Sequence, residues 1–113
     1  MPTLVYFGIQ GRAQPTRFAL AAAEVEYENK TLTQEEWGAA KAEGTYGVGA
    51  QLPVWIKDDG KIMNQSIAIL KYVCAVNGLV PDTPEGKYEN DWYFDARDDQ
   101  MKSLGAKIGP ILF

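Results

Sequence analysis

The feature that most constrains the fold is the stretch of twenty residues from 51 to 70, QLPVWIKDDGKIMNQSIAIL. Residues 53–56 are β-branched and aromatic, which favours a strand, and residues 58–60, Asp-Asp-Gly, are typical of a tight turn. Residues 61–63 suit a short return strand, and an apolar helix follows from Ser66. The stretch therefore predicts a β-hairpin that leads directly into a helix.

The same stretch offers places to hold a ligand. A helix that begins at Ser66 presents a hydroxyl and unpaired backbone N–H groups, which suit a carboxylate or a phosphate. Pro53 cannot donate to a β-ladder, and it keeps Leu52 extended. An extended backbone near a helix N-terminus can bind a small peptide as an added strand. The residues alone leave open an ordinary hairpin followed by an ordinary capped helix.

Composition excludes several classes of function. With 113 residues, of which 46% are hydrophobic, the chain suits one compact domain. A net charge of −4 without a basic run argues against nucleic acid and anionic membranes as partners. The chain contains no histidine, so Ser-His-Asp or Cys-His catalysis and histidine-based zinc sites are excluded, and we expect no metal site. Cys74 is the single cysteine, and its apolar surroundings indicate a buried, inert thiol.

The first fifty residues read as strand, helix, strand, helix and loop. Residues 4–7 suit a buried strand, and the helix that begins near Pro15 repeats apolar residues at positions 18, 21, 22 and 25, which we take as its buried stripe. Residues 25–32 alternate as a half-exposed strand does. Thr33 and Glu36 have the spacing of a capping box, which begins a helix reaching Lys41. A glycine-rich loop follows over residues 44–49.

Beyond the hairpin, the helix from Ser66 is apolar on two sides, which predicts burial between two layers, and it ends at Asn77-Gly78. A last helix begins at Glu85. Tyr88, Trp92 and Ala96 form one stripe along it, and Asp95, Asp98 and Asp99 cluster at helical spacing as a solubilising surface or a cation-attracting group. The order predicts an α/β chain of thioredoxin-like βαβαββα layout with a mixed four-stranded sheet, followed by a further helix.

Several separated motifs resemble one protein family. They lie in VYFGIQGRAQPTRFAL, in EEW with a lysine four residues on, in QLPVW and in NQSIAILKY, and in this order they resemble the N-terminal domain of cytosolic glutathione transferases of the sigma and mu types. The resemblance covers residues 3–77. Residues 85–100 resemble the first helix of that family's all-α second domain. It implies a glutathione-binding domain over residues 1–78, a linker over 79–84 and an incomplete helical domain over 85–113.

The resemblance assigns roles to residues at the matching positions. It implies that Tyr6 is catalytic, with its hydroxyl donating to the sulfur of glutathione, and that Arg12 steadies the site. The alternatives from the residues alone are a core aromatic and an exposed charge. Glutathione-binding roles are implied for eight further residues: Trp37, Lys41, Gln51, Leu52, Pro53, Gln65, Ser66 and Asp99.

Within that set, the resemblance distinguishes several contacts. Lys41 meets the glycine carboxylate, the cis bond of Leu52-Pro53 exposes a backbone that pairs with the cysteinyl unit, and Ser66 with Gln65 binds the γ-glutamyl carboxylate. Asp99 reaches across a homodimer to the neighbouring site. One departure from the family is a loop over residues 44–50 that is about three residues longer than usual.

The expected function is that of a cytoplasmic glutathione transferase, with glutathione as co-substrate and small hydrophobic electrophiles as second substrates. A sigma-like isomerase acting on a lipid endoperoxide is a subset of this expectation. The alternative is a non-catalytic module that keeps the fold but lacks a complete electrophile site. No segment is long and apolar enough for a spanning helix, and the lone cysteine indicates a reducing, soluble compartment.

Overall fold

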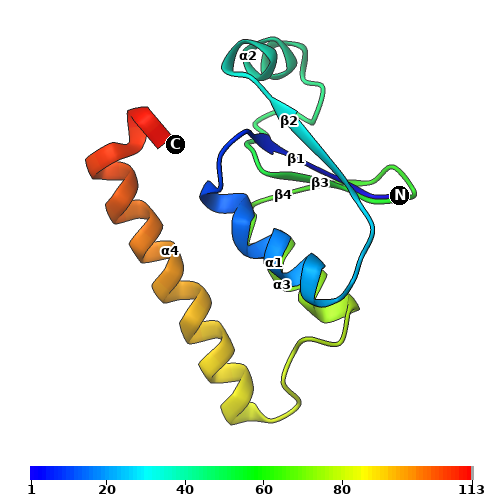
Figure 1. Cartoon of the computed structure of the whole chain (residues 1–113), viewed down its shortest axis with the longest axis vertical. Helices are drawn as coiled ribbons and strands as arrows, with labels where there is room; N and C mark the ends of the chain where they lie inside the picture. The colour runs from blue at the N-terminus through cyan, green and yellow to red at the C-terminus, as the bar shows by residue number, and fades with distance from the viewer. Residues whose placement is uncertain (113) are drawn as a thin grey trace.

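A mixed four-stranded sheet, in the order β2-β1-β3-β4, lies at the centre of the molecule (Figure 1). The structure, a computed structural model, describes the backbone of residues 1–112 and the side chains of residues 1–99. The strands are β1 (Thr3–Phe7), β2 (Glu28–Leu32), β3 (Val54–Ile56) and β4 (Ile62–Asn64). β1 is parallel to β2 and antiparallel to β3, and β3 is antiparallel to β4. The predicted mixed sheet is therefore confirmed.

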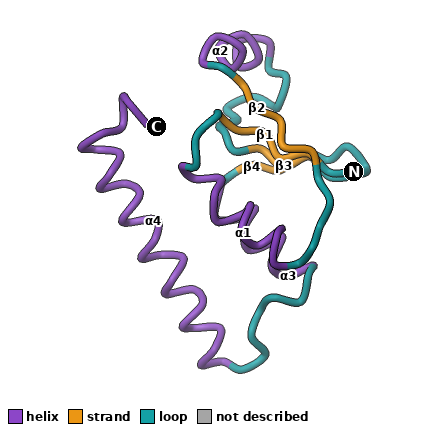
Figure 2. Tube along the Cα trace, viewed as in Figure 1, coloured by secondary structure: helices purple, strands orange, loops and turns teal. Residues whose placement is uncertain are grey.

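Helices cover both faces of this sheet (Figures 1 and 2). They are α1 (Gln14–Ala22), α2 (Gln34–Glu43), α3 (Ser66–Val76) and α4 (Pro84–Leu112), and a 3-10 turn, η1 (Gly11–Ala13), precedes α1. α1 and α3 contact each other on one face, and α2 lies on the other. The order of elements is the thioredoxin-like layout that the sequence predicted, with α4 following it.

Alternate residues of β1 serve the two layers of the core. Leu4 and Tyr6 face α1 and α3, where they pack in one buried cluster with Leu20 and Ile69. Val5 lies between them in sequence and joins the second cluster, on the α2 side. This period of two is expected for a central strand that is covered on both faces.

The buried stripe predicted for the first helix is wrong. Phe18 is 66% exposed, and Ala21 and Ala22 are also exposed. The residues of α1 that face the sheet are Thr16, Ala19 and Leu20, with Ala13 just before them. Because the helix is rich in alanine on several sides, the apolar period alone did not select the face that packs.

The second strand begins three residues later than predicted, at Glu28. The backbone N–H of Val25 still bonds to the carbonyl of Leu20, so this residue closes the end of α1. Glu24 has a positive φ of 55°, which turns the chain before the strand. The backbone N–H of Glu28 then bonds to the carbonyl of Pro2, and the ladder with β1 starts there.

Several residues that the sequence predicted at helix ends and in turns are confirmed there. Thr33 and Glu36 form both hydrogen bonds of the capping box at the start of α2. Gly60 has a positive φ of 86° in the hairpin turn, and Gly78 has one of 70° just after α3.

The loop after α2 is held in place by Tyr46, which is 8% exposed and stacks on Trp37 with ring centroids 6.4 Å apart.

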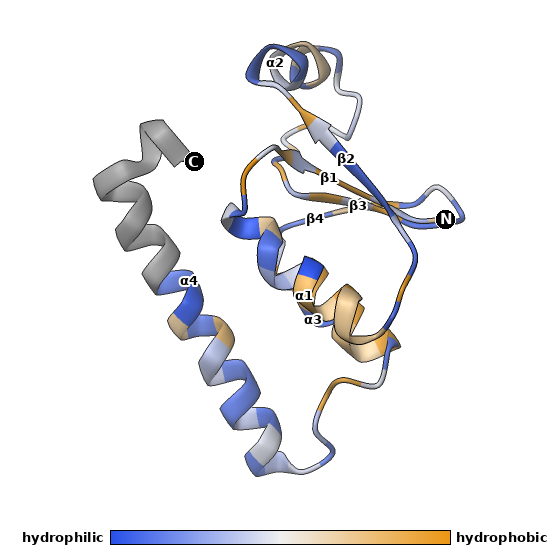
Figure 3. Ribbon diagram, viewed as in Figure 1, coloured by the Kyte–Doolittle hydropathy of each residue, from blue (hydrophilic) through white to orange (hydrophobic). Residues whose placement is uncertain are grey.

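Most residues of α3 are apolar, as the colours along its ribbon in Figure 3 indicate, and its buried side chains pack in one cluster with Leu4 of β1 and Phe94 of α4. Leu70 and Val73 on one predicted face and Ile69 on the other are buried, whereas Val76 is 60% exposed. The predicted burial on both sides therefore holds for the middle of the helix and not for its last turn. Cys74 is partly buried, and burial raises the pKa of its thiol, in keeping with the inert thiol predicted.

The residue of α4 that packs into the core does not belong to the aromatic stripe predicted from the sequence. Phe94 is 5% exposed and joins the core, while Tyr88 and Trp92 are 68% and 61% exposed. Asp98 turns toward Arg12, and among the described residues no group of three acidic, histidine or cysteine side chains could hold a metal ion. Over that same part of the chain, no helix is long and apolar enough to cross a membrane.

Candidate functional site

One end of the sheet gathers most of the residues singled out in the sequence. Val5 pairs with Val54 and Val54 pairs with Asn64, so the residues that follow Val5 and Asn64 lie at the same end as those that precede Val54. The strand register therefore brings Tyr6, the Leu52-Pro53 bond and the start of α3 at Ser66 to one end of the sheet. These three features are far apart in sequence, and only the sheet unites them.

The Tyr6 hydroxyl lies beneath the turn that follows β1. It accepts a hydrogen bond from the backbone N–H of Arg12 at 3.0 Å. Gly11, with a φ of 41°, comes so close that an added Cβ would lie 2.3 Å from the hydroxyl oxygen. The side chain of Tyr6 is 3% exposed. A hydroxyl has one proton and two lone pairs, so the bond from Arg12 leaves the Tyr6 proton available for another acceptor.

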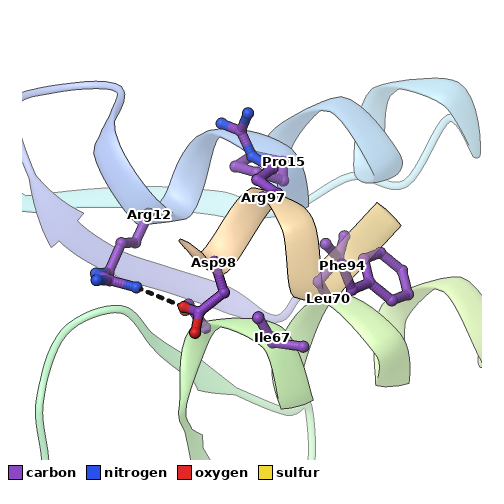
Figure 4. A pocket seen from close by; sticks show the side chains of 8 residues that line it. Arg12, Pro15, Ile67, Leu70, Phe94, Arg97 and Asp98 are labelled. Atoms are coloured by element: carbon purple, nitrogen blue, oxygen red, sulfur yellow. Dashed lines mark hydrogen bonds and ion pairs between the residues drawn. The ribbon is translucent and has the colours of Figure 1, made fainter. Parts of the chain in front are cut away.

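A small pocket beside this turn joins Arg12 to Ser66 (Figure 4). Arg12 and Asp98 both line it, and Arg12 donates to the carboxylate of Asp98 at 3.0 Å. The pocket is otherwise largely apolar, and its free volume is about 20 Å³, enough for roughly one water molecule. Its other lining residues are Pro15, Ile67, Leu70, Phe94 and Arg97.

The start of α3 has an unusual backbone. Gln65 precedes the first helical residue, Ser66, with a φ of 77°, and its side chain makes no capping hydrogen bond. The free N–H groups of the first turn are therefore available to an anion, and the helix dipole favours negative charge there. Positive φ is uncommon for residues other than glycine, and such residues gather at binding sites.

The segment before β3 has the bond that the resemblance implied. Leu52-Pro53 is cis. Pro53 is buried and Leu52 packs against both clusters of the core, whereas Gln51 is exposed. The side chains of Leu52 and Pro53 thus anchor this segment in the core, and its backbone lies at the end of the sheet.

The two residues predicted on α2 differ in their surroundings. Trp37 is half-buried, because it packs on Tyr46 and on the cluster beneath α2. Lys41, one turn later, is exposed. Neither residue lines the pocket between Arg12 and Ser66.

Asp99, which the resemblance assigns to the neighbouring site of a homodimer, lies apart from these residues. Asp99 is exposed and lines a hollow on the outer face of α4 with Tyr88, Trp92 and Asp95. Its neighbour Asp98 is the one that meets Arg12. The sequence placed Asp98 only in the acidic cluster with Asp95 and Asp99, because helical spacing does not show which of two adjacent acids faces inward.

Sequence reasoning missed Arg17 altogether. Its guanidinium carbon lies 5.8 Å from the centre of the Tyr6 ring. A guanidinium N–H of Arg17 donates to backbone carbonyls of the turn after β1. The available signal was its spacing: Arg17 stands three residues after Gln14, one helical turn into α1, so it can reach back over the turn.

Comparison with known proteins relates these features to one family. Residues 2–75 match the family described as glutathione S-transferase, N-terminal domain. Glutathione S-transferase 1 of Ascaris suum is 35% identical over 89% of this chain and 47% of its own length. Hematopoietic prostaglandin D synthase of Gallus gallus is 34% identical over 87% of this chain and 47% of its own length.

The fold is similar as well. The crystal structure of the glutathione S-transferase from Ascaris lumbricoides matches 92% of this chain and 49% of that chain, with a TM-score of 0.78 and 33% identity. The chain thus spans about half the length of the relatives that it matches.

Proposed function

This chain belongs to the glutathione S-transferase family, and on that premise we propose that it binds glutathione and activates its thiol for attack on small hydrophobic electrophiles. One observation carries the proposal. The Tyr6 hydroxyl, the cis Leu52-Pro53 bond and the free N-terminus of α3 lie at the same end of the sheet. A hydroxyl donor, an extended backbone and an anion site match the thiol, the peptide unit and the carboxylate of one tripeptide.

In this proposal the tripeptide lies along the end of the sheet, because the pocket between Arg12 and Ser66 is too small to enclose it. Its γ-glutamyl carboxylate binds the hydroxyl of Ser66 and the N–H groups of the first turn of α3, beside Gln65. Its cysteinyl unit pairs with the backbone of Leu52 as an added strand. Its sulfur then faces Tyr6.

Thiol activation follows from the hydrogen bond that Tyr6 donates. A hydrogen bond to a charged acceptor contributes about 1.5 to 3 kcal/mol, which corresponds to about one to two pKa units. A free thiol ionises near pH 8.5, so such a bond brings its pKa to about 7 and the thiolate fraction at neutral pH to about half. The backbone N–H of Arg12 supports this role, because it donates a hydrogen bond to the phenol oxygen and leaves the proton of Tyr6 free for the sulfur.

The remaining site residues form the periphery of the proposed site. Lys41 pairs with the glycine carboxylate, Trp37 steadies the same end, and Gln51 makes a polar contact at the rim. Asp99 completes the site of the other subunit in a homodimer. Its exposure on the outer face of α4 suits a residue that acts outside its own subunit.

The proposal extends to organisation and location. Residues 1–78 form the glutathione-binding domain, residues 79–84 are a linker, and residues 85–113 begin a helical domain. The proposed location is the cytoplasm, because a single cysteine can form no disulfide within the chain, which suits a reducing compartment.

A second activity of the same site has one supporting observation. A relative of similar identity is a prostaglandin D synthase. An isomerase that acts on a lipid endoperoxide would use the same activated thiolate, so it is a narrower form of the proposal.

A non-catalytic binding module is the alternative function. One observation favours it: Tyr6 is only 3% exposed, as a core aromatic residue would be. Such a module would keep the carboxylate site at Ser66 but would not complete a pocket for the electrophile.

Retention on immobilised glutathione, followed by turnover of a chromogenic electrophile such as 1-chloro-2,4-dinitrobenzene, separates these functions. The proposal expects the chain to be retained, to be eluted by free glutathione, and to accelerate conjugation. Ser66→Ala should weaken retention, whereas Thr83→Ala, outside the site, should not. Retention without turnover supports the module, and loss of retention contradicts both functions.

A further inference from the structure

The side chain of Arg17 joins three parts of the chain around the end of β1. It donates to the carbonyl oxygens of Ile9 at 3.1 Å and Gln10 at 3.5 Å, in the turn that follows the strand. It also donates to Gln14 on its own helix at 3.0 Å and to Asn29 on β2 at 3.3 Å. A planar guanidinium with five N–H donors can serve several acceptors at once.

The same guanidinium lies over the ring of Tyr6, with its central carbon 5.8 Å from the ring centre. Such a position is attractive because the face of an aromatic ring carries negative charge. The four acceptors of Arg17 are neutral, and among the described residues no carboxylate forms an ion pair with it. The positive charge of Arg17 therefore interacts with the Tyr6 ring and with the carbonyl oxygens of the turn.

The carbonyls that Arg17 binds come immediately before Gly11 and Arg12. The backbone N–H of Arg12 donates to the Tyr6 hydroxyl at 3.0 Å, and Gly11 packs against that oxygen. Arg17 therefore holds both partners of this hydrogen bond: the ring of Tyr6 through its face, and the turn through the carbonyls of Ile9 and Gln10.

We propose that Arg17 is the positioning residue for the Tyr6 hydroxyl. By holding the turn against Tyr6, it keeps the Arg12 N–H on the phenol oxygen, so the phenol proton points outward to the glutathione sulfur. Without Arg17 the turn can move away, and the hydroxyl proton is then free to rotate toward a backbone carbonyl. This inference rests on the proposed function, because it concerns the group that activates the thiol.

Arg17→Lys is the informative variant, since it keeps the charge but loses the planar fork. The measurement is the pKa of bound glutathione, followed by thiolate absorbance near 240 nm as the pH is raised. A parallel titration with S-methylglutathione, which has no ionisable thiol, reports binding alone. We expect the thiol pKa to rise by about one unit, which is a tenfold fall in the ratio of thiolate to thiol at fixed pH. Affinity for S-methylglutathione should stay within about twofold, since Arg17 acts through Tyr6.

The Tyr6→Phe background tests whether Arg17 acts through Tyr6. In that background Arg17→Lys should produce no further change in the thiol pKa, because the hydroxyl that it positions is gone. An equal rise in both backgrounds would contradict the inference. So would an unchanged pKa in Arg17→Lys, or a parallel loss of S-methylglutathione affinity, which indicates a structural role only.

Two milder variants cover the case in which Arg17→Lys does not fold. Gln14→Met and Asn29→Ala each remove one anchor of the guanidinium, and each should raise the thiol pKa by a smaller amount. Unchanged values in both would overturn the inference. Failure of the proposed function is seen separately, in the wild-type chain: a bound thiol that titrates like free glutathione removes the role of Tyr6 itself.

Discussion

The Arg12 guanidinium lies 3.0 Å from the carboxylate of Asp98, although the two residues are 86 positions apart. This ion pair joins the turn after β1 to α4, and both of its residues line the pocket that Ser66 also lines. It therefore links the packing of α4 to the segment that holds the Tyr6 hydroxyl.

A double-mutant cycle on this pair should give a modest coupling energy. The side chains of Arg12 and Asp98 are 32% and 23% exposed, so solvent screens their attraction only in part. Urea unfolding of Arg12→Met, Asp98→Asn and the double variant should give a coupling of about 0.5 to 1 kcal/mol, which decreases at high salt. The matched cycle on Lys71 and Asp91, a more exposed pair at 44% and 60%, should give less. A coupling no larger than in this control would contradict the structural role of the pair.

Tyr6→Phe should separate binding from activation. It removes only the hydroxyl, so affinity for glutathione should change little, while the pKa of the bound thiol should rise by about one unit or more. Thiolate absorbance against pH measures this, and Tyr27→Phe, whose ring packs against Trp55, is the control. An unchanged thiol pKa in Tyr6→Phe would remove Tyr6 from its proposed role.

Gly11→Ala should be among the most harmful single substitutions of glycine in this chain. The new Cβ would lie 2.3 Å from the Tyr6 oxygen and would also sit at a φ of 41°. Gly44→Ala is the control: it also has a positive φ, of 68°, but its added Cβ meets nothing within 4 Å. Gly44→Ala should cost about 1 to 2 kcal/mol of unfolding free energy, and Gly11→Ala should cost more.

The clash can be tested by removing its other partner. In the double variant Gly11→Ala, Tyr6→Phe the hydroxyl is absent, so part of the lost stability should return. Thermal unfolding of the single and double variants measures this recovery. Strictly additive effects would show that the strain comes from the backbone alone.

Thr16→Val should stabilise the fold. Thr16 is 1% exposed, and its hydroxyl oxygen has no hydrogen-bond partner among the described residues. A valine of similar shape removes the cost of a buried, unpaired polar group, with a gain of about 1 kcal/mol. Thr33→Val is the opposite control, because its hydroxyl caps α2, and its loss should cost about 1 kcal/mol. A loss of stability in Thr16→Val would indicate that the hydroxyl binds water.

The capping box of α2 should respond to acid. The pKa of Glu36 is lowered from its usual 4.5, chiefly because its carboxylate accepts the backbone N–H of Thr33. A lowered pKa in the folded state means that the stabilisation is present above pH 4.5 and is lost as the pH falls through the folded value. The carboxyl carbon of Glu36, followed by NMR, should titrate with a pKa below the usual 4.5. In Glu36→Gln, α2 should be less sensitive to acid over this range.

Helix ends and turns were predicted well where the residues that interact lie close together in the sequence. Thr33 and Glu36 are three residues apart, and Gly60 lies inside the turn that needs its positive φ, so no distant residue was required. The buried face of α1 was predicted wrongly, because its alanines are apolar on more than one side and the sheet selected Thr16 over Phe18.

The sequence by itself determined the order of the elements, their caps and turns, and the family to which the chain belongs, since these depend on residue types at short spacings. The tertiary structure alone decided which side chains meet. It turned Asp98 and not Asp99 toward Arg12, and it placed Arg17 over Tyr6. Such contacts depend on the rotation of each helix against the sheet, a quantity that is set by the packing of both faces together and that no single segment encodes.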